Sequence, residues 1–339
     1  MIHLLQKTFI FVLSLLLTLP ALAKIRLVEW HTANTIAPLV LPVRDGETPE
    51  EASERYLKAL SQNSELLELF AGRVPEMKTI KFQEIGNNDY DTRIMMIANR
   101  APDYTQNSPR VANFKKYFDK MNQKSFILPV VANLGLTKQE STELNTEITE
   151  KFPMLVALGG DDVDPRFYKT QNAYSRNLNT VRDRFEINLI KDYVTSAKGF
   201  LLGVCRGSQL SSVALGYKMV QDIPAEVGMS VHHGDDWHDV KLTPTTNGIL
   251  KSVLPAAESL LVNSYHHQAV IFKEGGPLEI AARSEDGITE ATEFKNGRGL
   301  LLQFHPELMG NELGFEIVRK AVSAKNRSLP LRCSRTFSY

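Results

Sequence analysis

The sequence predicts an α/β protein in which a mainly parallel β-sheet is covered by helices on both faces. Three observations predict this class. From Thr92 onward, short apolar segments alternate with longer amphipathic segments, which is the pattern of repeated strand–helix units. Segments such as Ile94–Ala98 are apolar throughout, as strands buried on both faces are. Glycine-containing turns follow two of these strands, at Gly159-Gly160 and beside Cys205, and ligand sites gather at such strand ends.

The N-terminal segment has the features of a signal peptide. Lys7 precedes the apolar stretch Thr8–Leu19, which is followed by Pro20-Ala-Leu-Ala23. These are a charged region, an apolar region and a small-residue cleavage site. The apolar stretch would span about 18 Å as a helix, well short of the roughly 30 Å hydrocarbon core of a bilayer. We therefore expect residues 1–23 to be removed after Ala23, and the mature protein to be periplasmic or secreted rather than held by an uncleaved anchor.

Residues 24–90 form an N-terminal extension without a chemical motif, and its role is open among a lid, an edge addition to the sheet and a dimer contact. We expect strands at Ile25–Trp30 and Pro38–Val43. The segment Thr48–Phe70 is predicted as one helix, because Thr48 is an N-cap residue, acidic residues follow it and Gly72 lies just past the end.

The main domain is expected over residues 91–325, with a C-terminal tail at 326–339. Thr137 followed by Glu140 is a capping box that predicts a helix start. The expected strands are Arg93–Ala98, Phe126–Val131, Met154–Leu158, Phe200–Val204, Val240–Leu242, Leu260–Val262, Leu278–Ala282, Thr289–Glu293 and Leu300–Phe304. The expected helices are Val111–Met121, Thr137–Lys151, Arg182–Val194, Gln209–Leu215 and Asn311–Lys325.

The composition is that of an ordinary globular protein. The chain has 339 residues, 43% of them hydrophobic and 23% charged, with a formal net charge of +0. This balance argues against nucleic acid or an anionic membrane as the main partner. There is no internal repeat, and the two cysteines, Cys205 and Cys333, form no metal-binding pattern.

The segment Gly203-Val-Cys-Arg-Gly207 directly follows an apolar strand and precedes a helix, which predicts a nucleophile elbow. The glycines allow a tight turn that presents the central side chain, here Cys205, at the end of the sheet. The amide groups at the start of the following helix favour a thiolate. A disulfide between Cys205 and Cys333 is the less favoured alternative, because it would block this group.

A cysteine nucleophile requires a base that is itself oriented. His305 ends an apolar strand, Pro306 stops that strand, and Glu307 lies two residues further on. A carboxylate at this spacing can hold one imidazole nitrogen while the other faces the sulfur. The alternative is a strand-end turn without a catalytic function. The backbone N–H groups of Arg206 and of Gly160 are candidate oxyanion donors, although the glycine pair could serve only to make a turn.

These motifs resemble the class I glutamine amidotransferase family, and within it the gamma-glutamyl-gamma-aminobutyrate hydrolase-like peptidases. The resemblance covers roughly residues 92–325. Besides the elbow, the matching segments are Gly159-Gly-Asp-Asp-Val-Asp-Pro165, Arg182-Asp183 with Glu186, Val213-Ala-Leu-Gly216, Gln221-Asp-Ile-Pro224, Val262-Asn-Ser-Tyr-His-His-Gln268, Ser284-Glu-Asp-Gly287 and Gln303-Phe-His-Pro-Glu307. The resemblance implies a flavodoxin-like α/β fold and no cofactor.

The resemblance also implies a role for individual residues. The implied roles are Cys205 as nucleophile, His305 as general base and acid, Glu307 as its orienting carboxylate, the amides of Gly160 and Arg206 as oxyanion donors, Gln209 as a contact to the glutamyl group, and His266 and His267 as borders of the pocket. Either histidine could equally be structural. Arg182, Asp183 and Glu186 are either a structural ion-pair set or part of a binding site.

The sequence departs from the resembled branch in four places. Tyr217 stands where the branch usually has a second glycine, and Leu158 replaces the usual proline. The segment His232–His238 is unusually rich in histidine. We expect a loop near the substrate entrance there and no metal site, since spacing alone does not show one. The extension 24–90 has no counterpart.

The expected function is hydrolysis of a gamma-glutamyl amide or peptide bond through a thioester on Cys205. Export favours it over ammonia donation, because an exported protein lacks an obvious ATP-consuming synthetase partner and the sequence contains no P-loop motif. Folyl polyglutamates and gamma-linked cell-wall peptides remain open as substrates. The alternatives are a glutaminase or amidotransferase acting with a partner, and a catalytically silent binding protein. A small-molecule substrate is the expected partner, and a homo-oligomer is open.

Overall fold

The computed structural model describes residues 24–328, so the expected signal peptide and Cys333 lie outside the described residues. No helix within 24–328 is long and apolar enough to cross a membrane. The strands are β1 (Ile25–Thr32), β2 (Leu39–Arg44), β3 (Thr79–Glu84), β4 (Arg93–Ile97), β5 (Lys124–Leu128), β6 (Met154–Ala157), β7 (Phe200–Val204), β8 (Lys218–Val220), β9 (Gly234–Leu242), β10 (Ser259–Tyr265), β11 (Ala269–Ile271), β12 (Leu278–Ser284), β13 (Thr289–Phe294) and β14 (Gly299–Leu302). The α-helices are α2 (Pro49–Ser61), α3 (Ser64–Glu68), α4 (Pro109–Lys120), α5 (Lys138–Lys151), α6 (Thr180–Ser196), α7 (Arg206–Ala214), α8 (Ile223–Glu226) and α9 (Glu312–Ser328).

A 12-stranded mixed sheet organises the chain, in the order β10-β9-β12-β13-β14-β7-β6-β4-β5-β2-β1-β3. The central run from β14 to β2 is parallel throughout. Antiparallel strands extend it at both edges. The parallel centre confirms the predicted fold class, and the antiparallel edges account for the short strands expected in the last third of the chain.

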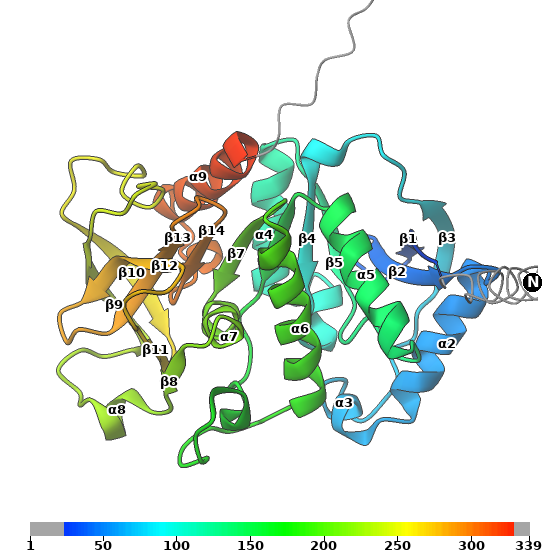
Figure 1. The fold of residues 1–339 in the computed structure, drawn as a ribbon, viewed down its shortest axis with the longest axis horizontal. Coiled ribbons are helices and arrows are strands. Elements are labelled where there is room, and N and C mark those ends of the chain that lie inside the picture. The colour runs from blue at the N-terminus through cyan, green and yellow to red at the C-terminus, as the bar shows by residue number, and fades with distance from the viewer. Residues whose placement is uncertain (1–23, 329–339) are drawn as a thin grey trace, which may run out of the picture.

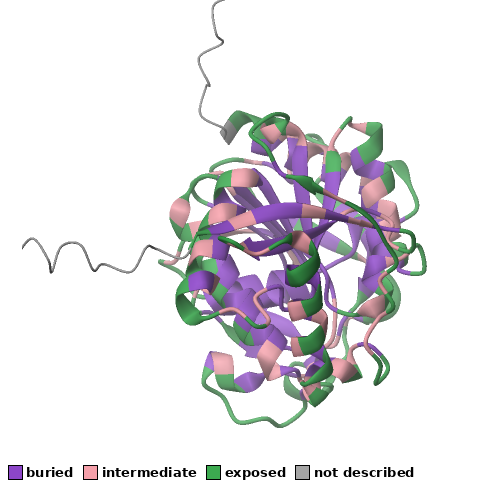
Figure 2. Cartoon of the chain, turned by 90° about the vertical axis from the view of Figure 1, so that its right-hand side faces the viewer, coloured by how far each residue is buried: buried purple, intermediate pink, exposed green. Residues whose placement is uncertain are grey.

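Helices cover both faces of the parallel centre. Helices α5, α6 and α7 pack side by side in one layer, while α4 and α9 contact each other in the other layer (Figure 1). Every residue of β4, β6, β7 and β14 is buried, which explains why these strands, apart from Arg93 at the start of β4, are apolar instead of alternating. Figure 2 shows buried residues along the strands and exposed residues on the outer sides of the helices.

The N-terminal extension belongs to the same sheet. β2 pairs with β5 in parallel through Leu39 and Ile127, and β1 and β3 continue the sheet outward from β2. Trp30 and Leu39 are buried in the hydrophobic core that also contains Ile94. Strand β3 was not predicted, because it is exposed at nearly every position and only Ile80 and Phe82 alternate with its polar residues.

Two expected elements differ from the structure. The single helix expected over Thr48–Phe70 is two helices, because the Asn63 side chain accepts a hydrogen bond from Leu66 N and starts α3. The N-cap predicted at Thr48 is confirmed, and Glu51 completes a capping box there. The loop expected at His232–His238 is wrong: Gly234–Leu242 is strand β9, paired along its length with β10. The pairing was not visible from the sequence, because the only buried apolar residues of this strand are Val240 and Leu242 at its end.

Candidate active site

Cys205 lies at the turn between β7 and α7. Its φ of 50° and ψ of −114° are unfavourable for a residue with a side chain, and its N–H donates to the Leu302 carbonyl at 2.7 Å. The flanking glycines permit the close packing behind this turn. A Cβ on Gly203 would lie 2.8 Å from Leu301 Cδ2, and one on Gly207 would overlap the Ala157 carbonyl oxygen. The elbow predicted from the sequence therefore exists, with α7 starting directly at Arg206.

His305 and Glu307 meet Cys205 from the end of β14. His305 Nδ1 lies 2.7 Å from Glu307 Oε1, and the imidazole also hydrogen-bonds to Cys205. Burial disfavours the charged imidazole, but the Glu307 carboxylate and Cys205 outweigh burial and raise the pKa of His305 to about 10. The structure thus brings the three residues together as a hydrogen-bonded chain that favours a protonated imidazole beside the sulfur.

Asn263 of β10 fixes the backbone of His305. Its Oδ1 accepts from His305 N and its Nδ2 donates to His305 O, both at 2.9 Å, and its side chain is fully buried. The Tyr265 ring lies 5.9 Å from the imidazole, centroid to centroid, in an edge-on orientation. Sequence reasoning assigned neither residue a role, although both lie in the segment Val262–Gln268 that carries the family resemblance.

Gly159 leaves the space that the imidazole occupies. A Cβ at this position would lie 2.6 Å from His305 Cε1 and 3.3 Å from Cys205 Cβ. The Gly159 carbonyl accepts from Arg110 Nη1 at 2.5 Å and from Asn99 Nδ2 at 3.0 Å, so its peptide is held in place. Arg110 and Asn99 carry no motif, and only their tertiary contacts reveal this positioning role.

Gly160 lies against Arg206. A Cβ on Gly160 would lie 3.0 Å from Arg206 Cδ, so the glycine turn faces the start of α7. The first amides of a helix have no acceptor within that helix. The two expected oxyanion donors, the amides of Gly160 and Arg206, therefore come from segments that meet next to Cys205.

The Arg206 side chain lies in a buried ion-pair network beneath the elbow. Its guanidinium contacts Asp183 Oδ1 at 2.5 Å, Glu186 Oε2 at 2.8 Å and Asn99 Oδ1 at 2.7 Å. Arg182 lies 3.5 Å from Asp183 in the same network, and all these charged side chains are at most 2% exposed. Of the two alternatives for Arg182, Asp183 and Glu186, this geometry corresponds to the structural ion-pair set.

The three expected substrate contacts lie in different surroundings. Gln209 is buried, and its Nε2 donates to Gln268 O at 3.0 Å and to Gln303 Oε1 at 3.2 Å. His267 bridges Asp162 and Asp222 at 3.0 and 3.1 Å. His266 is buried with Nε2 directed toward a carboxylate of β13. A substrate contact by any of them stays a prediction.

Comparison with known proteins places this site in a family. The sequence profile of peptidase C26 matches residues 96–307, more than half of the chain. The chain belongs to the peptidase C26 family. The protein NtpR of Enterococcus hirae is 34% identical to this C26 peptidase over 192 residues, covering 53% of this chain and 75% of NtpR. The glutamine amidotransferase-like protein YvdE of Lactococcus lactis is 33% identical over 197 residues, covering 58% and 79%.

A solved structure supports the fold assignment of this C26 peptidase. The glutaminase domain of Trypanosoma brucei CTPS superposes with a TM-score of 0.51 at 14% identity, covering 72% of this chain and 98% of that domain. The family profile and the relatives confirm the class I glutamine amidotransferase-like family expected from the motifs. The superposition confirms the expected fold. The chain is a hydrolase of the glutamine amidotransferase type.

Proposed function

We propose that this C26 peptidase hydrolyses gamma-glutamyl amide bonds through a glutamyl thioester on Cys205. The observation that carries the proposal is the hydrogen-bonded chain from Cys205 through His305 to Glu307. A carboxylate-oriented imidazole next to a cysteine at an elbow is the arrangement that acyl transfer requires.

The proposed reaction has two halves. The Cys205 sulfur attacks the gamma carbonyl, and the amides of Gly160 and Arg206 stabilise the oxyanion. His305 then gives its proton to the leaving amine as the C–N bond breaks, leaving the thioester. In the second half, His305 takes a proton from water and the hydroxide attacks the thioester. The C–S bond then breaks, which releases glutamate and leaves the Cys205 thiolate beside the protonated His305. Glu307 keeps the imidazole oriented throughout.

Two features support a gamma-glutamyl substrate and hydrolysis. The motifs shared with gamma-glutamyl-gamma-aminobutyrate hydrolase-like peptidases extend well beyond the elbow, to segments such as Val262–Gln268. The signal-like segment 1–23 supports export, where an ATP-dependent synthetase to accept ammonia is not expected. We therefore place the activity in the periplasm or outside the cell.

The test compares residues 24–339 with Cys205→Ala on gamma-glutamyl-gamma-aminobutyrate, gamma-glutamyl dipeptides and glutamine. Matched alpha-glutamyl dipeptides control for the linkage. We expect turnover of a gamma-linked compound, a glutamyl hydroxamate when hydroxylamine traps the thioester, and loss of both in the variant. No turnover of any gamma-linked compound, with the Cys205 thiol titrated as free, overturns the proposal. Activity on glutamine only when a second protein is added indicates an amidotransferase instead.

Export has its own test. The protein is expressed from its full sequence with a C-terminal tag in a Gram-negative host, and the fractions are sequenced from the N-terminus. We expect a periplasmic or secreted protein that begins at Lys24. A cytoplasmic protein that retains Met1 would refute export and cleavage without affecting the proposed chemistry.

A further inference from the structure

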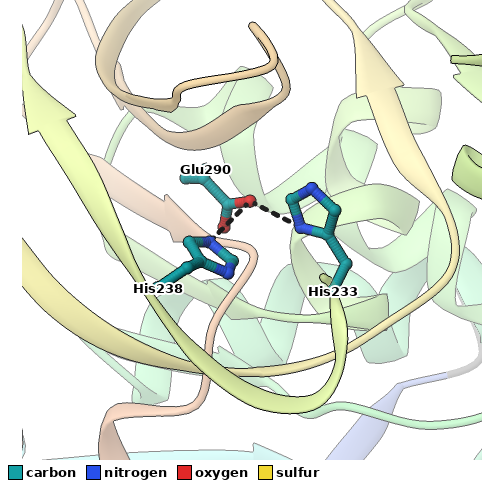
Figure 3. A group of neighbouring side chains, drawn as sticks. All are labelled: His233, His238 and Glu290. Carbon is teal, nitrogen blue, oxygen red and sulfur yellow. Dashed lines mark ion pairs between the residues drawn. The ribbon is translucent and has the colours of Figure 1, made fainter. Parts of the chain in front are cut away.

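Three imidazoles converge on one buried carboxylate outside the Cys205 site. His233 precedes β9, His238 lies in β9, His266 follows β10, and all face Glu290 of β13. Figure 3 shows His233 and His238 on opposite sides of the Glu290 carboxylate. These four side chains are only 3%, 10%, 2% and 0% exposed, respectively. Such a set of imidazole and carboxylate donors is the one that Zn²⁺ prefers.

Within this cluster, the ligand atoms of His233, His238 and Glu290 all lie within 4.8 Å of one another, and the distances from Glu290 to these two imidazoles match a metal coordination sphere. Glu290 Oε1 lies 3.3 Å from His233 Nδ1, 3.4 Å from His238 Nε2 and 3.7 Å from His266 Nε2. In a tetrahedron with Zn–ligand bonds of roughly 2.0–2.1 Å, neighbouring ligand atoms are about 3.3–3.4 Å apart. A direct hydrogen bond would bring them closer, to about 2.7–2.9 Å.

The opposite nitrogen of each imidazole has an acceptor of its own. His233 Nε2 lies 2.9 Å from Asp286 Oδ2, and His266 Nδ1 lies 3.0 Å from Gln268 O. His238 Nδ1 lies 3.4 Å from His232 O. Such outer contacts hold the proton on the far nitrogen and direct the lone pair of the near nitrogen inward, as they do for metal-bound histidines.

The inward atoms lack hydrogen-bond partners in the described part of the chain. They are the three near nitrogens and both Glu290 oxygens, all of them buried. With the outer nitrogens protonated, these five acceptor atoms face one another with no donor between them, which is costly in a buried site. A cation at the centre removes this cost.

We infer that His233, His238 and Glu290 form a site for one divalent transition-metal ion, with Zn²⁺ the best match to the donors and His266 packed beside them. The protein supplies three ligands, and a water molecule would complete the tetrahedron. This site differs from the Cys205 site in its residues and its chemistry, and it does not depend on the proposed hydrolysis.

The bound ion would brace the strands that support His305. It joins β9 and β13, and the backbone of Glu290 accepts from Gln303 N at 2.7 Å, two residues before His305. β10 carries both His266 at its end and Asn263, which holds the His305 backbone. Metal binding is therefore expected to stabilise the fold and to order the base, without touching the substrate.

The sequence analysis expected no metal because the ligands come from two separate segments. The histidines at 233 and 238 were noted, but Glu290 is 52 positions beyond His238 in the sequence. Only the pairing of β12 with both β9 and β13 brings Glu290 under the histidines.

The test is a metal measurement on the full mature protein. The protein is stripped with a strong chelator, dialysed and titrated with ZnCl₂, and bound metal is measured by mass spectrometry. We expect one Zn²⁺ per chain and a melting temperature raised by about 3–6 °C at Zn²⁺ hundredfold above Kd, with no effect of MgCl₂. Co²⁺ in place of Zn²⁺ should give the visible absorption of a tetrahedral site.

Glu290→Gln and His238→Gln should lose the stoichiometric ion. His232→Gln is the matched control, because this neighbouring imidazole is 57% exposed and its side chain lies outside the cluster. It should bind Zn²⁺ as the wild type does. A stripped wild-type protein that binds no Zn²⁺, Co²⁺ or Ni²⁺ overturns the inference and indicates protonated imidazoles paired with Glu290. This outcome needs no variant, so misfolding of the variants cannot hide it. Binding that His232→Gln abolishes would also overturn it.

Discussion

Replacing Gly159 by alanine tests whether the position of His305 limits the reaction. The new Cβ would lie 2.6 Å from His305 Cε1, whereas carbon atoms in contact are about 3.5–4.0 Å apart. About 1 Å of movement is therefore required. The imidazole cannot move freely, because Nδ1 is bonded to Glu307 at 2.7 Å. The Gly159 peptide cannot move freely either, because Arg110 and Asn99 hold its carbonyl oxygen.

A displacement of this size in a catalytic group costs on the order of 10²-fold in rate. We expect kcat/KM of Gly159→Ala on a gamma-glutamyl substrate to fall about 10²-fold, which is ~2.7 kcal/mol of transition-state stabilisation. The loss should lie in kcat, since the substituted atom contacts the base. The rate of Cys205 alkylation by iodoacetamide, measured against pH, reports the same displacement without any substrate.

Gly86→Ala is the control for this substitution. Gly86 is exposed, has no atom within 4 Å of an added Cβ, and should leave kcat/KM and the alkylation profile unchanged. If Gly159→Ala keeps its melting temperature and its kcat/KM stays within twofold of the wild type, the positions of Gly159 and His305 described above are wrong.

Three further substitutions or measurements follow from the same geometry. Asn263→Ala leaves the buried His305 N–H without a partner and its C=O with only the Leu308 N–H, so we expect the free energy of unfolding to fall by about 1–3 kcal/mol and kcat to fall more than KM changes, in denaturant melts and steady-state kinetics. The pKa of His305, about 10 in the folded state, exceeds the ordinary value near 6.5, so its stabilising contribution is complete below pH 6.5 and is lost as pH rises through 10. The free energy of unfolding, measured between pH 6.5 and 10, should show this loss, and Glu307→Gln should reduce it. If the free energy of unfolding falls with pH equally in the wild type and in Glu307→Gln, Glu307 does not raise the pKa of His305. Gly207→Ala drives a Cβ into the Ala157 carbonyl oxygen and should destabilise the fold by about 1–3 kcal/mol or more, whereas an unchanged melting temperature would exclude the close approach of α7 to β6.

Local patterns in the sequence were sufficient for the elements that dominate the fold. The apolar strands of the parallel centre could be predicted because burial on both faces leaves no polar position in them. The starts of helices α2 and α5 at Thr48 and Thr137 were predicted because N-cap contacts join residues only three positions apart. The elbow was equally local, since its glycines and Cys205 adjoin one another.

The prediction failed where the signal depends on a distant partner. Thr79–Glu84 has only a short alternation of Ile80 and Phe82 with polar residues, and its ladder partner β1 lies roughly fifty residues away in the chain. The segment from Gly234 to Leu242 was expected to be partly a loop, because a strand with a polar exposed face near a sheet edge lacks an apolar alternation.

The sequence by itself determined the α/β class, the elbow at Cys205 and the candidate base with its carboxylate, because each depends on residues adjacent in the chain. The tertiary structure decided which groups support them: Asn263 on the His305 backbone, Arg110 on Gly159, and the carboxylates around Arg206. It also decided that three histidines face Glu290. These contacts join residues tens of positions apart, and only the packing of the strands and helices brings such residues within hydrogen-bonding or coordination distance.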